Sequence, residues 1–451
     1  MIVMKFGGSS VASAERIRWV TQIVKDQLDR RPLLVLSAMG DTTDHLLEAA
    51  EDALKRGIVS VEKIEELHLK TMEELELKVS AQGEINSLLY ELRSLLTGIS
   101  LIRELTGRTR DYLVSFGERL SVRIAAAYLK SQHIDGRAID AWDAGFLSDS
   151  GFTAAELVKE SWGLIPKALI PLVEGGALPV VTGFIAKDAK GNITTLGRGG
   201  SDLTASMIAA ACGAEEVQVW KDVDGILTAD PRIVPEARPV ETVTYDEAAE
   251  LAYFGAQVLH PRAMLPCMKT GTPVLVKNSY NLKAPGTRIV SAVDKQTWPV
   301  QAITSRKNVI LVDIVSTRML GQYGFLAEVF SCFARHGISV DMVATSEVSI
   351  SLTLDAAHDL AALGGELSGI AKVEIKTGMA IVTIIGDVRR SSEILQRAFG
   401  VCAGLGIQVQ MVSQGASKVN ISFIVNDIQA QEVVRALHKN FFGEPGEGGN
   451  R

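Results

Sequence analysis

Continuous apolar runs and helix-spaced apolar residues alternate along the chain from residue 1 to about 290. Continuous runs indicate strands that are covered on both faces, and they occur in IVM at residues 2–4 and in RPLLVLSAMG, ALPVVTGFIA, EEVQVWKDVDG and GTPVLVKNS. Between them, apolar residues at helical spacing predict helices, including residues 43–54 and an almost wholly helical insertion over 59–107. This alternation predicts a largely parallel sheet with helices on both faces and a ligand site at the carboxyl ends of its strands.

After about residue 300 the pattern changes to shorter units that repeat at a constant offset of 69 residues, as for Gly337 and Gly406 (406 − 337). Each copy predicts a helix, a glycine that ends it and then a strand, and such a repeated unit predicts two small ferredoxin-like modules. The repeated positions are Leu326, Phe330, Ala334, Gly337, Ile338, Val340, Met342 and Val343 in the first copy, and Leu395, Phe399, Ala403, Gly406, Ile407, Val409, Met411 and Val412 in the second. Because no apolar residue follows Phe442, we expect residues 443–451 to be disordered.

The first predicted strand ends in KFGGSS, in which Lys5 is followed by the glycine pair Gly7 and Gly8. Ser9 or Ser10 can cap the helix that follows. A strand, a glycine turn and a helix start form a group of N–H donors that attracts an anion, here with the Lys5 ammonium beside it. Many doubly wound proteins carry glycines in their first turn, so this motif alone does not separate an anion site from a structural turn.

A second glycine-rich anion site is predicted in TLGRGGSDLTASMIAAACG, residues 195–213. Arg198 and the pair Gly199–Gly200 lead into Ser201 and Asp202, which stand at helix-cap positions, and Gly213 ends the helix. Asp202 could be a plain N-cap. An arginine beside bare backbone favours bidentate recognition of a carboxylate or a phosphate, so Arg198 is the stronger indication of a ligand.

The helix in RDYLVSFGERLSVRIAAAYL carries a carboxylate within an apolar stripe. Glu118 lies in line with Val114 and Val122, whereas Arg119 and Arg123 lie to the side. A carboxylate among apolar residues requires a cation. That cation is either a protein arginine, which would make a structural ion pair, or the ammonium group of a substrate.

A third predicted strand ends within VWKDVDGILTADPR, where Asp222 and Asp224 precede Gly225. The D-x-D-G pattern can be a turn, or it can hold a ribose hydroxyl or Mg²⁺ at the carboxyl end of a strand. The sequence contains no G-x-x-x-x-G-K-[ST], G-x-G-x-x-G, H-R-D or D-F-G motif. A nucleotide would therefore bind by other means.

Composition excludes several other classes of protein. The net charge of −7 gives no support to nucleic-acid binding through a basic surface, and no apolar run reaches membrane length. The 4 cysteines have no paired spacing and the 7 histidines form no H-x-H or H-E-x-x-H group, so we expect a reducing compartment and no protein-built zinc site. The first predicted strand begins at residue 2, which leaves no room for a signal or transit peptide. We expect a cytosolic, globular protein.

Together, the motifs resemble those of the aspartate kinases, in the same order and spacing over nearly the whole chain. They are KFGGSS, SAMGDTTD, SFGERLS, TGFIA, TTLGRGGSD, WKDVDGILTADPR and FGAQVLHPRAM. The resemblance implies an α/β amino-acid-kinase fold over residues 1–292, with a mixed, mostly parallel eight-stranded sheet between helices. It also implies two ferredoxin-like ACT modules over 300–442, the first at about 315–384 and the second at about 300–314 with 385–442. The implied reaction of the monofunctional form is ATP + L-aspartate → ADP + 4-phospho-L-aspartate, the first step toward lysine, threonine and methionine.

The resemblance also assigns residues to each reactant. Those near the transferring phosphoryl group would be Lys5, Gly7, Gly8, Ser9, Ser37 and Asp202, with Asp202 orienting Lys5. Those for aspartate would be Glu118 at the α-ammonium, Arg198 at the α-carboxylate, and Thr43 and Ser201 beside them. Those for the rest of ATP, which brings Mg²⁺, would be Lys221, Asp222, Leu227, Arg232 and Gln257. No catalytic base is required, because the β-carboxylate of aspartate, with a pKa of about 4, is already ionised at neutral pH. Positive charge then lets two anions meet.

Two positions depart from the family pattern. Gln257 stands where many members have a lysine that contacts nucleotide phosphates, and Lys221 stands where many have threonine. We expect that the positive charge has moved from one loop to the other.

The first repeat resembles the lysine site of the family, which lies between paired ACT modules and implies a homodimer or a dimer of dimers. Glycines at 321–324 offer N–H groups to a carboxylate, and Asp341, Ser346 and Glu347 offer anions and hydroxyls to a cation. The matching residues are Met319, Gly324, Phe325, Leu326, Val340, Asp341, Thr345, Ser346, Glu347 and Val348. Gln410 replaces Asp341 in the second copy, so we expect one effector site per chain, with lysine as inhibitor and threonine as the alternative.

Three other interpretations remain open. The chain could be a related kinase that acts on glutamate or another carboxylate. It could be a non-catalytic amino-acid sensor built on ACT modules. The two repeats could also serve only to pack dimers.

Overall fold

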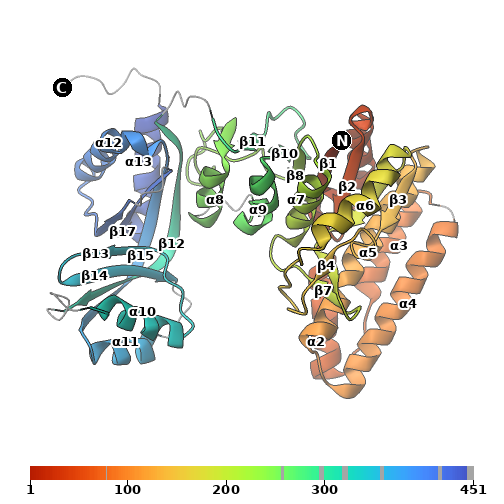
Figure 1. The fold of residues 1–451 in the computed structure, drawn as a ribbon, viewed down its shortest axis with the longest axis horizontal. Helices are drawn as coiled ribbons and strands as arrows, with labels where there is room; N and C mark the ends of the chain where they lie inside the picture. Colours follow the sequence, from red (N-terminus) through yellow and green to blue (C-terminus); the bar gives the residue numbers. More distant parts are fainter. Residues whose placement is uncertain are drawn as a thin grey trace. The chain divides into compact units, whose positions relative to one another are not determined.

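The computed structural model describes residues 1–77, 79–254, 259–293, 299–316, 323–355, 360–414 and 419–443. These residues form two compact units (Figure 1). Unit 1 comprises Met1–Ile226, Glu241–Tyr245 and Val258–Ala292, and unit 2 comprises Leu227–Val240, Asp246–Gln257 and Val293–Arg451, each as far as it is described. Two segments between residues 227 and 257, which lie within the predicted 1–292 domain, therefore belong to unit 2.

Unit 1 is built on an eight-stranded sheet with the order β3-β5-β2-β1-β8-β10-β11-β9. The strands are β1 (Ile2–Phe6), β2 (Pro32–Leu36), β3 (Gly136–Ile139), β5 (Leu178–Thr182), β8 (Val217–Lys221), β9 (Thr242–Thr244), β10 (Val274–Asn278) and β11 (Thr287–Val290). Neighbouring strands are parallel except for the antiparallel pair β10–β11. Every residue of β1, β2 and β5 is buried, as their continuous apolar runs require. The predicted mixed, mostly parallel sheet is confirmed.

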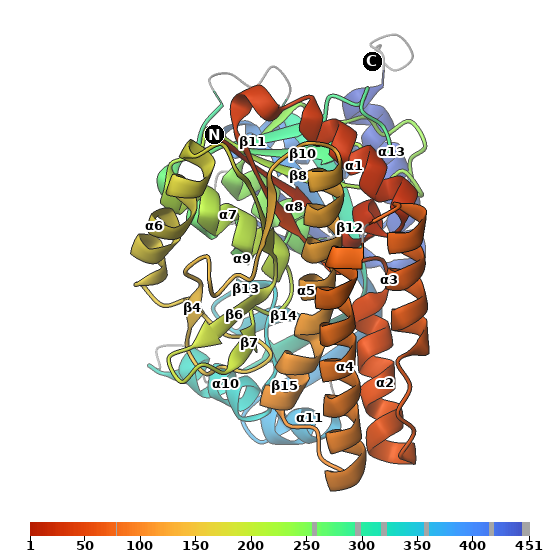
Figure 2. The ribbon, with the colours of Figure 1, turned by 90° about the vertical axis from the view of Figure 1, so that its right-hand side faces the viewer.

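Helices cover this sheet. They are α1 (Ala14–Lys25), α2 (Thr42–Arg56), α3 (Glu62–Glu74), α4 (Val79–Ile102), α5 (Gly107–Ser131), α6 (Ser161–Glu174), α7 (Gly200–Cys212) and α9 (Pro261–Thr270). The predicted helical insertion is α3 and α4, and Figure 2 shows these helices with α2 alongside α5. One apolar cluster, with Phe6, Leu36, Leu46, Leu92 and Phe116 among its members, joins β1 and β2 to α2, α4 and α5. The ends of β1 and β2 are thereby fixed against α5.

Two local predictions in unit 1 are wrong. Neither Ser9 nor Ser10 caps α1, because residues Gly8–Val11 form a short 3₁₀ turn and Ser13 is the cap, accepting a hydrogen bond from the N–H of Arg16. ALPVVTGFIA is not one strand. It ends β5 at Thr182 and begins β6 (Ile185–Asp188), which joins β4 (Leu147–Ser148) and β7 (Ile193–Thr195) in a separate three-stranded sheet.

The break between β5 and β6 lies at a close approach of two backbones. A Cβ on Gly183 would lie 2.6 Å from the Cβ of Ser201, so the chain passes the start of α7 at a point where only glycine fits. The next residue, Phe184, has a φ of 69°. The chain therefore turns out of the large sheet directly beside the predicted anion site.

Unit 2 contains a six-stranded antiparallel sheet with the order β13-β14-β12-β15-β17-β16. Its strands are β12 (Val300–Val315), β13 (Val343–Thr345), β14 (Ser349–Asp355), β15 (Lys372–Gly386), β16 (Met411–Ser413) and β17 (Asn420–Asn426). Its helices are α10 (Phe325–Arg335), α11 (Leu360–Ser368), α12 (Ser391–Gly404), α13 (Ala430–Phe442) and α8 (Tyr245–Phe254), which enters unit 2 at Asp246. The two predicted ferredoxin-like modules are confirmed.

The internal repeat is visible in the structure of unit 2. In the first copy α10 is followed by Gly337, with a φ of 63°, and then by β13, and in the second α12 is followed by Gly406, with a φ of 67°, and then by β16. The modules share two long strands, because β12 residues 309–315 pair with β14 whereas residues 300–306 pair with the last part of β15. The predicted division at residues 314/315 and 384/385 does not capture this sharing.

The segment Leu227–Val240 contributes to the core of the second module. Ala229 and Val234 pack in one apolar cluster with Ile303 and Phe423, and the N–H of Ile303 donates to the carbonyl of Thr228 at 2.8 Å. Thr228 Oγ1 lies 2.9 Å from His438 Nε2 on α13. This segment is therefore an integral part of unit 2.

The four cysteines are free thiols, in agreement with their spacing. Among the helices that the structure describes, none is long and apolar enough to cross a membrane.

Candidate active site

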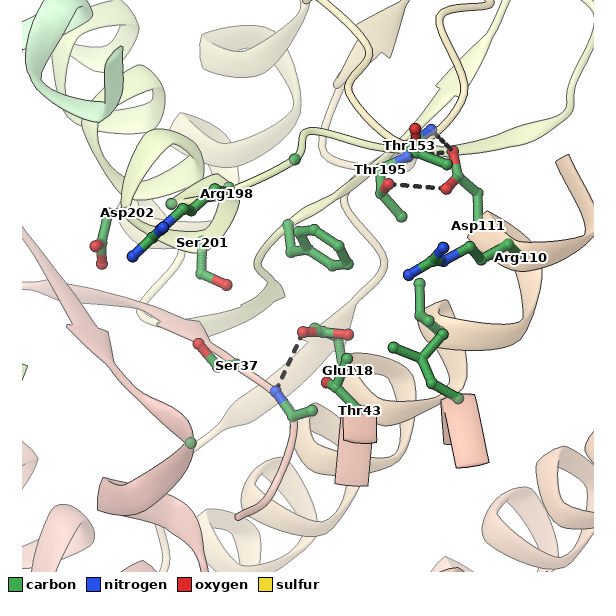
Figure 3. A pocket seen from close by; sticks show the side chains of 18 of the residues that line it. Ser37, Thr43, Arg110, Asp111, Glu118, Thr153, Thr195, Arg198, Ser201 and Asp202 are labelled. Atoms are coloured by element: carbon green, nitrogen blue, oxygen red, sulfur yellow. Dashed lines mark hydrogen bonds between the residues drawn. The ribbon is translucent and has the colours of Figure 1, made fainter. Parts of the chain in front are cut away.

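A cavity of about 670 Å³ lies in unit 1 at the carboxyl ends of β1 and β2, where the parallel-sheet prediction places a ligand. Figure 3 shows side chains from α5, the loop after β2 and the start of α7 around it. Its lining includes Lys5, Gly8, Ser37, Thr43, Glu118, Arg198, Ser201 and Asp202 from the sequence predictions. The structure thus brings together residues that are almost two hundred positions apart.

A cluster of charges lies at one corner of the cavity, where Lys5 and Asp202 belong to the lining and Lys221 lies behind them. Lys5 Nζ lies 2.6 Å from Asp202 Oδ1, and Lys221 Nζ lies 3.3 Å from Asp202 Oδ2. Burial alone would raise the pKa of Asp202, but the charges of Lys5 and Lys221 outweigh it and hold the pKa below its usual value. Burial also lowers the pKa of Lys221, and the nearby Lys5 acts in the same direction. The cluster carries one more positive charge than negative, which suits a phosphate.

The interpretation of Asp202 as a plain N-cap is wrong. The N-cap of α7 is Gly199, with a φ of 74° and no side-chain capping bond, and Asp202 is the third residue of the helix. Its carboxylate is occupied by the two lysines. The predicted end of this helix at Gly213, with a φ of 64°, is confirmed.

The glycine turn after β1 brings two loops into contact. A Cβ on Gly8 would lie 2.9 Å from the carbonyl oxygen of Ala38, and the N–H of Gly40 donates to the carbonyl of Gly8 at 3.1 Å. A Cβ on Gly7 would lie 3.7 Å from Lys5 Nζ. The absence of side chains here lets the loop after β2, with Ser37, approach the Lys5 ammonium.

Glu118 is buried on α5 with only half of its carboxylate engaged. Oε1 accepts a hydrogen bond from the N–H of Ala38 at 3.3 Å, whereas Oε2 has no hydrogen-bond partner in the described part of the chain. Burial raises the pKa of Glu118 to about 8, against the weaker effects of its backbone hydrogen bonds and of the Lys5 charge. A cation beside Oε2 would therefore favour the ionised form of this side chain.

The arginines next to Glu118 have other partners. Arg123 makes two 3.0 Å bonds to the carboxylate of Asp140, and Arg119 lies 3.4 Å from Glu91. Within the described ranges, no ion pair joins Glu118 to an arginine or a lysine. Among these described residues, Glu118 therefore does not form the structural ion pair with a protein arginine.

Arg198 and Ser201 lie opposite Glu118 across the cavity. Figure 3 shows them beside Asp202, facing the side that carries Glu118 and Thr43. The loop that carries Arg198 has two left-handed glycines, Gly197 with a φ of 72° and Gly199 with a φ of 74°. The cavity thus has an acidic and a basic wall, in the arrangement that an amino-acid zwitterion requires.

Sequence reasoning missed several residues of the cavity. These are Ala38, Gly40, Leu47, Arg110, Asp111, Val114, Thr153, Phe184, Thr195 and Gly197. Asp111 lies seven residues before Glu118, so both side chains occupy one face of α5. That spacing is the signal that could have found it.

Other predicted ATP residues lie outside the cavity. Asp222 follows Lys221 directly, and the carbonyl of the exposed Ser9 accepts a hydrogen bond from the Tyr280 hydroxyl at 2.9 Å. Leu227 and Arg232 belong to unit 2, where the Arg232 guanidinium is paired with Asp230. Gln257 lies outside the described residues.

The D-x-D-G pattern is a structural turn at its second aspartate. Asp224 accepts hydrogen bonds from the side-chain amides of Asn278 at 2.7 Å and Asn281 at 3.1 Å. In the ranges that are described, no group of three or more His, Cys, Asp or Glu residues is arranged to hold a metal ion.

The predicted effector residues lie in the first module of unit 2. Gly324, with a φ of 90°, is the N-cap of α10. The side chain of Asp341 is 4% exposed, lies 3.2 Å from Arg306 Nη1 and accepts a hydrogen bond from the hydroxyl of Tyr253 on α8. Arg306 also pairs with Asp355. Met319 lies outside the described residues.

The hydroxyl group of Ser346 lies 2.7 Å from that of Ser349 and accepts from the N–H of Ser349 at 3.1 Å. The turn that leads from β13 to β14 is therefore held in place by this serine.

Comparisons with known proteins agree with this architecture. Residues 1–278 match the amino acid kinase family, and residues 312–363 and 382–441 match an ACT domain. The chain is 52% identical to the chloroplastic aspartokinase 1 of Arabidopsis thaliana, with 98% of this chain and 80% of the relative covered. It is 35% identical to the lysine-sensitive aspartokinase 3 of Escherichia coli, with 98% and 99% covered.

Solved structures give the same result. The E. coli aspartokinase III in complex with aspartate and ADP (R-state) superposes with a TM-score of 0.82 at 34% identity, covering 98% of this chain and 100% of that one. The same enzyme in complex with lysine and aspartate (T-state) gives a TM-score of 0.80 at 34% identity, covering 98% and 99%. The chain therefore belongs to the amino acid kinase family and, within it, to the aspartokinases.

Proposed function

We propose that this aspartate kinase transfers the γ-phosphoryl group of ATP to the β-carboxylate of L-aspartate in the cavity of unit 1. The observation that carries the assignment is the buried carboxylate of Glu118, which keeps one oxygen unpaired in the same cavity as Lys5. A buried carboxylate without a protein cation is stabilised when a substrate ammonium binds. The acidic wall then selects an amino acid, and the lysine corner supplies the charge for phosphoryl transfer.

Aspartate would be held at both ends of its backbone. Glu118 Oε2 would accept the α-ammonium, and Arg198 would bind the α-carboxylate with Thr43 and Ser201 beside it. This orientation directs the β-carboxylate toward the remaining charged corner of the cavity, where Lys5 lies. The related E. coli enzyme in complex with aspartate and ADP supports the choice of both substrates.

Catalysis would consist of positioning and charge. Lys5 would hold the transferring phosphoryl group together with the loop of Gly7, Gly8 and Ser9, in which the N–H of Gly7 donates to the carbonyl of Trp220 at 3.4 Å, and Asp202 would fix the Lys5 ammonium through their 2.6 Å contact. The attacking β-carboxylate needs no base, because it is ionised at neutral pH. Mg²⁺ arrives with ATP and offsets the phosphate charge.

We assign the outer part of ATP to Lys221, Asp222, Leu227, Arg232 and Gln257. The roles of Leu227, Arg232 and Gln257 rest on the family resemblance alone. Lys221 has a structural argument as well, since its ammonium shares the Asp202 carboxylate with Lys5. We propose that its charge replaces the family lysine that is missing at Gln257.

We further propose that lysine inhibits the enzyme by binding to the first ACT module, at the residues from Met319 to Val348 named above. The charge of Asp341, whose side chain is 4% exposed, suits the side-chain ammonium of lysine, and Gln410 at the equivalent place in the second module does not. The lysine-sensitive E. coli relative and its complex with lysine support this choice over threonine. We also propose that ACT modules of two chains pair in a homodimer or a dimer of dimers. The cytosolic compartment remains a proposal, because the Arabidopsis relatives are chloroplastic proteins.

A coupled ADP-release assay with aspartate or glutamate as acceptor tests the activity. We expect ADP release when aspartate is the acceptor and none when glutamate is. Release with glutamate but not aspartate would indicate a kinase for another carboxylate. Lysine binding without ADP release from either acceptor would indicate a non-catalytic sensor.

A further inference from the structure

Asp111 joins the acidic wall of the cavity to its basic wall. Its Oδ2 atom accepts hydrogen bonds from the N–H of Thr153 at 2.8 Å and from the N–H of Thr195 at 2.9 Å. Its Oδ1 atom accepts the hydroxyl of Thr195 at 2.9 Å. Figure 3 shows the three residues together at one side of the cavity. One side chain on α5 thus holds the end of β7 by two hydrogen bonds and the loop at Thr153 by a third.

Thr195 is the start of the loop that carries Arg198. The carbonyl of Thr195 accepts from the N–H of Ala155 at 2.8 Å, and the N–H of Leu196 donates to the carbonyl of Phe184 at 2.8 Å. Beyond Leu196 the loop contains the two left-handed glycines, whose backbone is the least restricted of any residue. The place at which this loop leaves the sheet is therefore set by Thr195 and its partners.

Asp111 and Glu118 lie two turns apart on the same face of α5. A helix is rigid over two turns, so fixing Thr195 to Asp111 also fixes it relative to Glu118. We propose that Asp111 is a positioning residue, which sets the Arg198 loop at the distance from Glu118 that matches the backbone of aspartate. This inference rests on the proposed roles of Glu118 and Arg198, and it adds a residue that touches neither substrate.

The bonding of Asp111 makes this role testable. In an Asp111→Ala variant both N–H groups and the Thr195 hydroxyl lose their acceptor. In Asp111→Asn the amide oxygen can replace Oδ2 and keep both N–H bonds, and the amide nitrogen can donate to the hydroxyl of Thr195, which accepts as well as donates. Alanine should therefore release the loop, whereas asparagine should retain most of its position.

Asp188 lies in the hairpin of β6 and β7, which also contains Thr195, and it provides a matched control for Asp111. Asp188 is 3% exposed and Asp111 1%, and Asp188 also accepts two backbone N–H groups, from Lys190 at 2.9 Å and Asn192 at 2.8 Å. It holds the turn at the far end of the hairpin, away from Thr195. Asp188→Ala should lower the Tm as Asp111→Ala does, without moving Arg198.

The experiment measures KM and kcat for both substrates in the full-length enzyme, with Tm for each variant. Asp111→Ala should raise the KM for aspartate by about ten- to a hundredfold, the cost of a misplaced binding group, with the KM for ATP changed less than about twofold. Asp111→Asn should recover most of the loss, and Asp188→Ala should leave both KM values at wild type. If Asp111→Ala does not fold, Thr195→Val removes only the hydroxyl bond and should raise the aspartate KM about threefold.

A double-mutant cycle with Arg198→Ala separates this inference from the function on which it rests. If Asp111 acts through Arg198, Asp111→Ala should add little to the loss caused by Arg198→Ala. Additive losses, an unchanged aspartate KM in Asp111→Ala (or in Thr195→Val where alanine does not fold), or an equal rise in Asp188→Ala would overturn the positioning role. A normal aspartate KM in Arg198→Ala alone would instead overturn the proposed role of Arg198.

Discussion

The ammonium of Lys5 lies 2.6 Å from Oδ1 of Asp202, and both side chains are buried. The second oxygen of the same carboxylate lies 3.3 Å from Lys221, so one anion fixes two cations. Cations held in place before the substrates arrive need no reorganisation during the reaction, which makes their effect on a developing charge larger than in water.

Replacing Lys5 by alanine should lower kcat by about two to three orders of magnitude, as the loss of one preorganised charge does. ADP release with saturating aspartate and ATP measures the effect. Lys187→Ala is the matched control, because Lys187 stacks 4.0 Å over the ring of Trp142, outside the residues that line the cavity. A folded Lys5→Ala enzyme with near-normal kcat would contradict the role of Lys5.

Aspartate binding should depend on pH through Glu118. The pKa of Glu118 is raised to about 8 by burial, so below this pH the carboxyl group must lose its proton before it can accept an ammonium. The KM for aspartate should therefore fall by up to about tenfold for each pH unit from 6 to 8 and then level off. In Glu118→Gln the KM should be high and independent of pH. Calorimetry of aspartate binding in buffers of different ionisation enthalpy should show proton release near pH 7, and its absence would count against this prediction.

The stability of the folded enzyme should fall as pH rises, whereas its affinity for aspartate should rise. The pKa of Glu118 is raised above its ordinary value of 4.5, so between pH 4.5 and 8 the folded protein keeps a proton that the unfolded chain has lost. The free energy of unfolding then falls as pH rises, by up to about 1.4 kcal/mol per pH unit from this group. Glu118→Gln removes the effect, so its Tm advantage over wild type, measured without aspartate, should grow from pH 5 to pH 8. A constant difference would show that Glu118 does not titrate in this range.

Lys221→Thr should raise the KM for ATP by about tenfold, the loss of one charge-assisted hydrogen bond. Adding Gln257→Lys should restore part of the loss if the positive charge has moved between the two loops. The cycle of single and double variants gives the coupling directly. Strictly additive changes in the KM for ATP would rule the exchange out.

Lysine inhibition should depend on the charge of Asp341. In Asp341→Ala, the lysine concentration for half-maximal inhibition should rise by more than about tenfold, because the carboxylate that pairs with the side-chain ammonium of lysine is lost. Asp355→Ala is the control, because Asp355 also pairs with Arg306 but its side chain is 50% exposed. It should leave lysine inhibition in place. Inhibition by threonine in place of lysine, or lysine inhibition that survives Asp341→Ala, would show that the effector is assigned wrongly.

Local apolar pattern was sufficient to predict β1, β2, β5, β8 and β10 of unit 1, whereas the eight-stranded mixed sheet was implied by the family resemblance. The burial of β1, β2 and β5 follows from runs such as IVM and LLVL, and the end of α7 follows from Gly213. The repeat in unit 2 was equally visible, because Gly337 and Gly406 end their helices in the same left-handed conformation.

What the sequence could not give depends on contacts between distant residues. The strand breaks at Gly183, where the start of α7 passes beside it, and nothing in ALPVVTGFIA indicates that approach. Arg123, the arginine five residues after Glu118, is bound to Asp140 just beyond β3, and the spacing along α5 does not reveal this partner. The spacing from Glu118 could have placed Asp111 on the same face of α5, but its hydrogen-bond partners could not be found in this way, since they are 42 and 84 residues away.

The packing of Leu227–Val240 into unit 2 limits how this enzyme can be cut or recombined. A fragment that stops at residue 292 keeps Ala229 and Val234 but lacks the strands that cover them, and Thr228 loses Ile303 and His438 as partners. Such a fragment should expose apolar surface and aggregate, whether or not its catalytic cavity is sound. A chimera that exchanges regulatory units between relatives would have to carry residues 227–240 with the incoming unit. The reason is that the two units are not separated by a single boundary in the sequence.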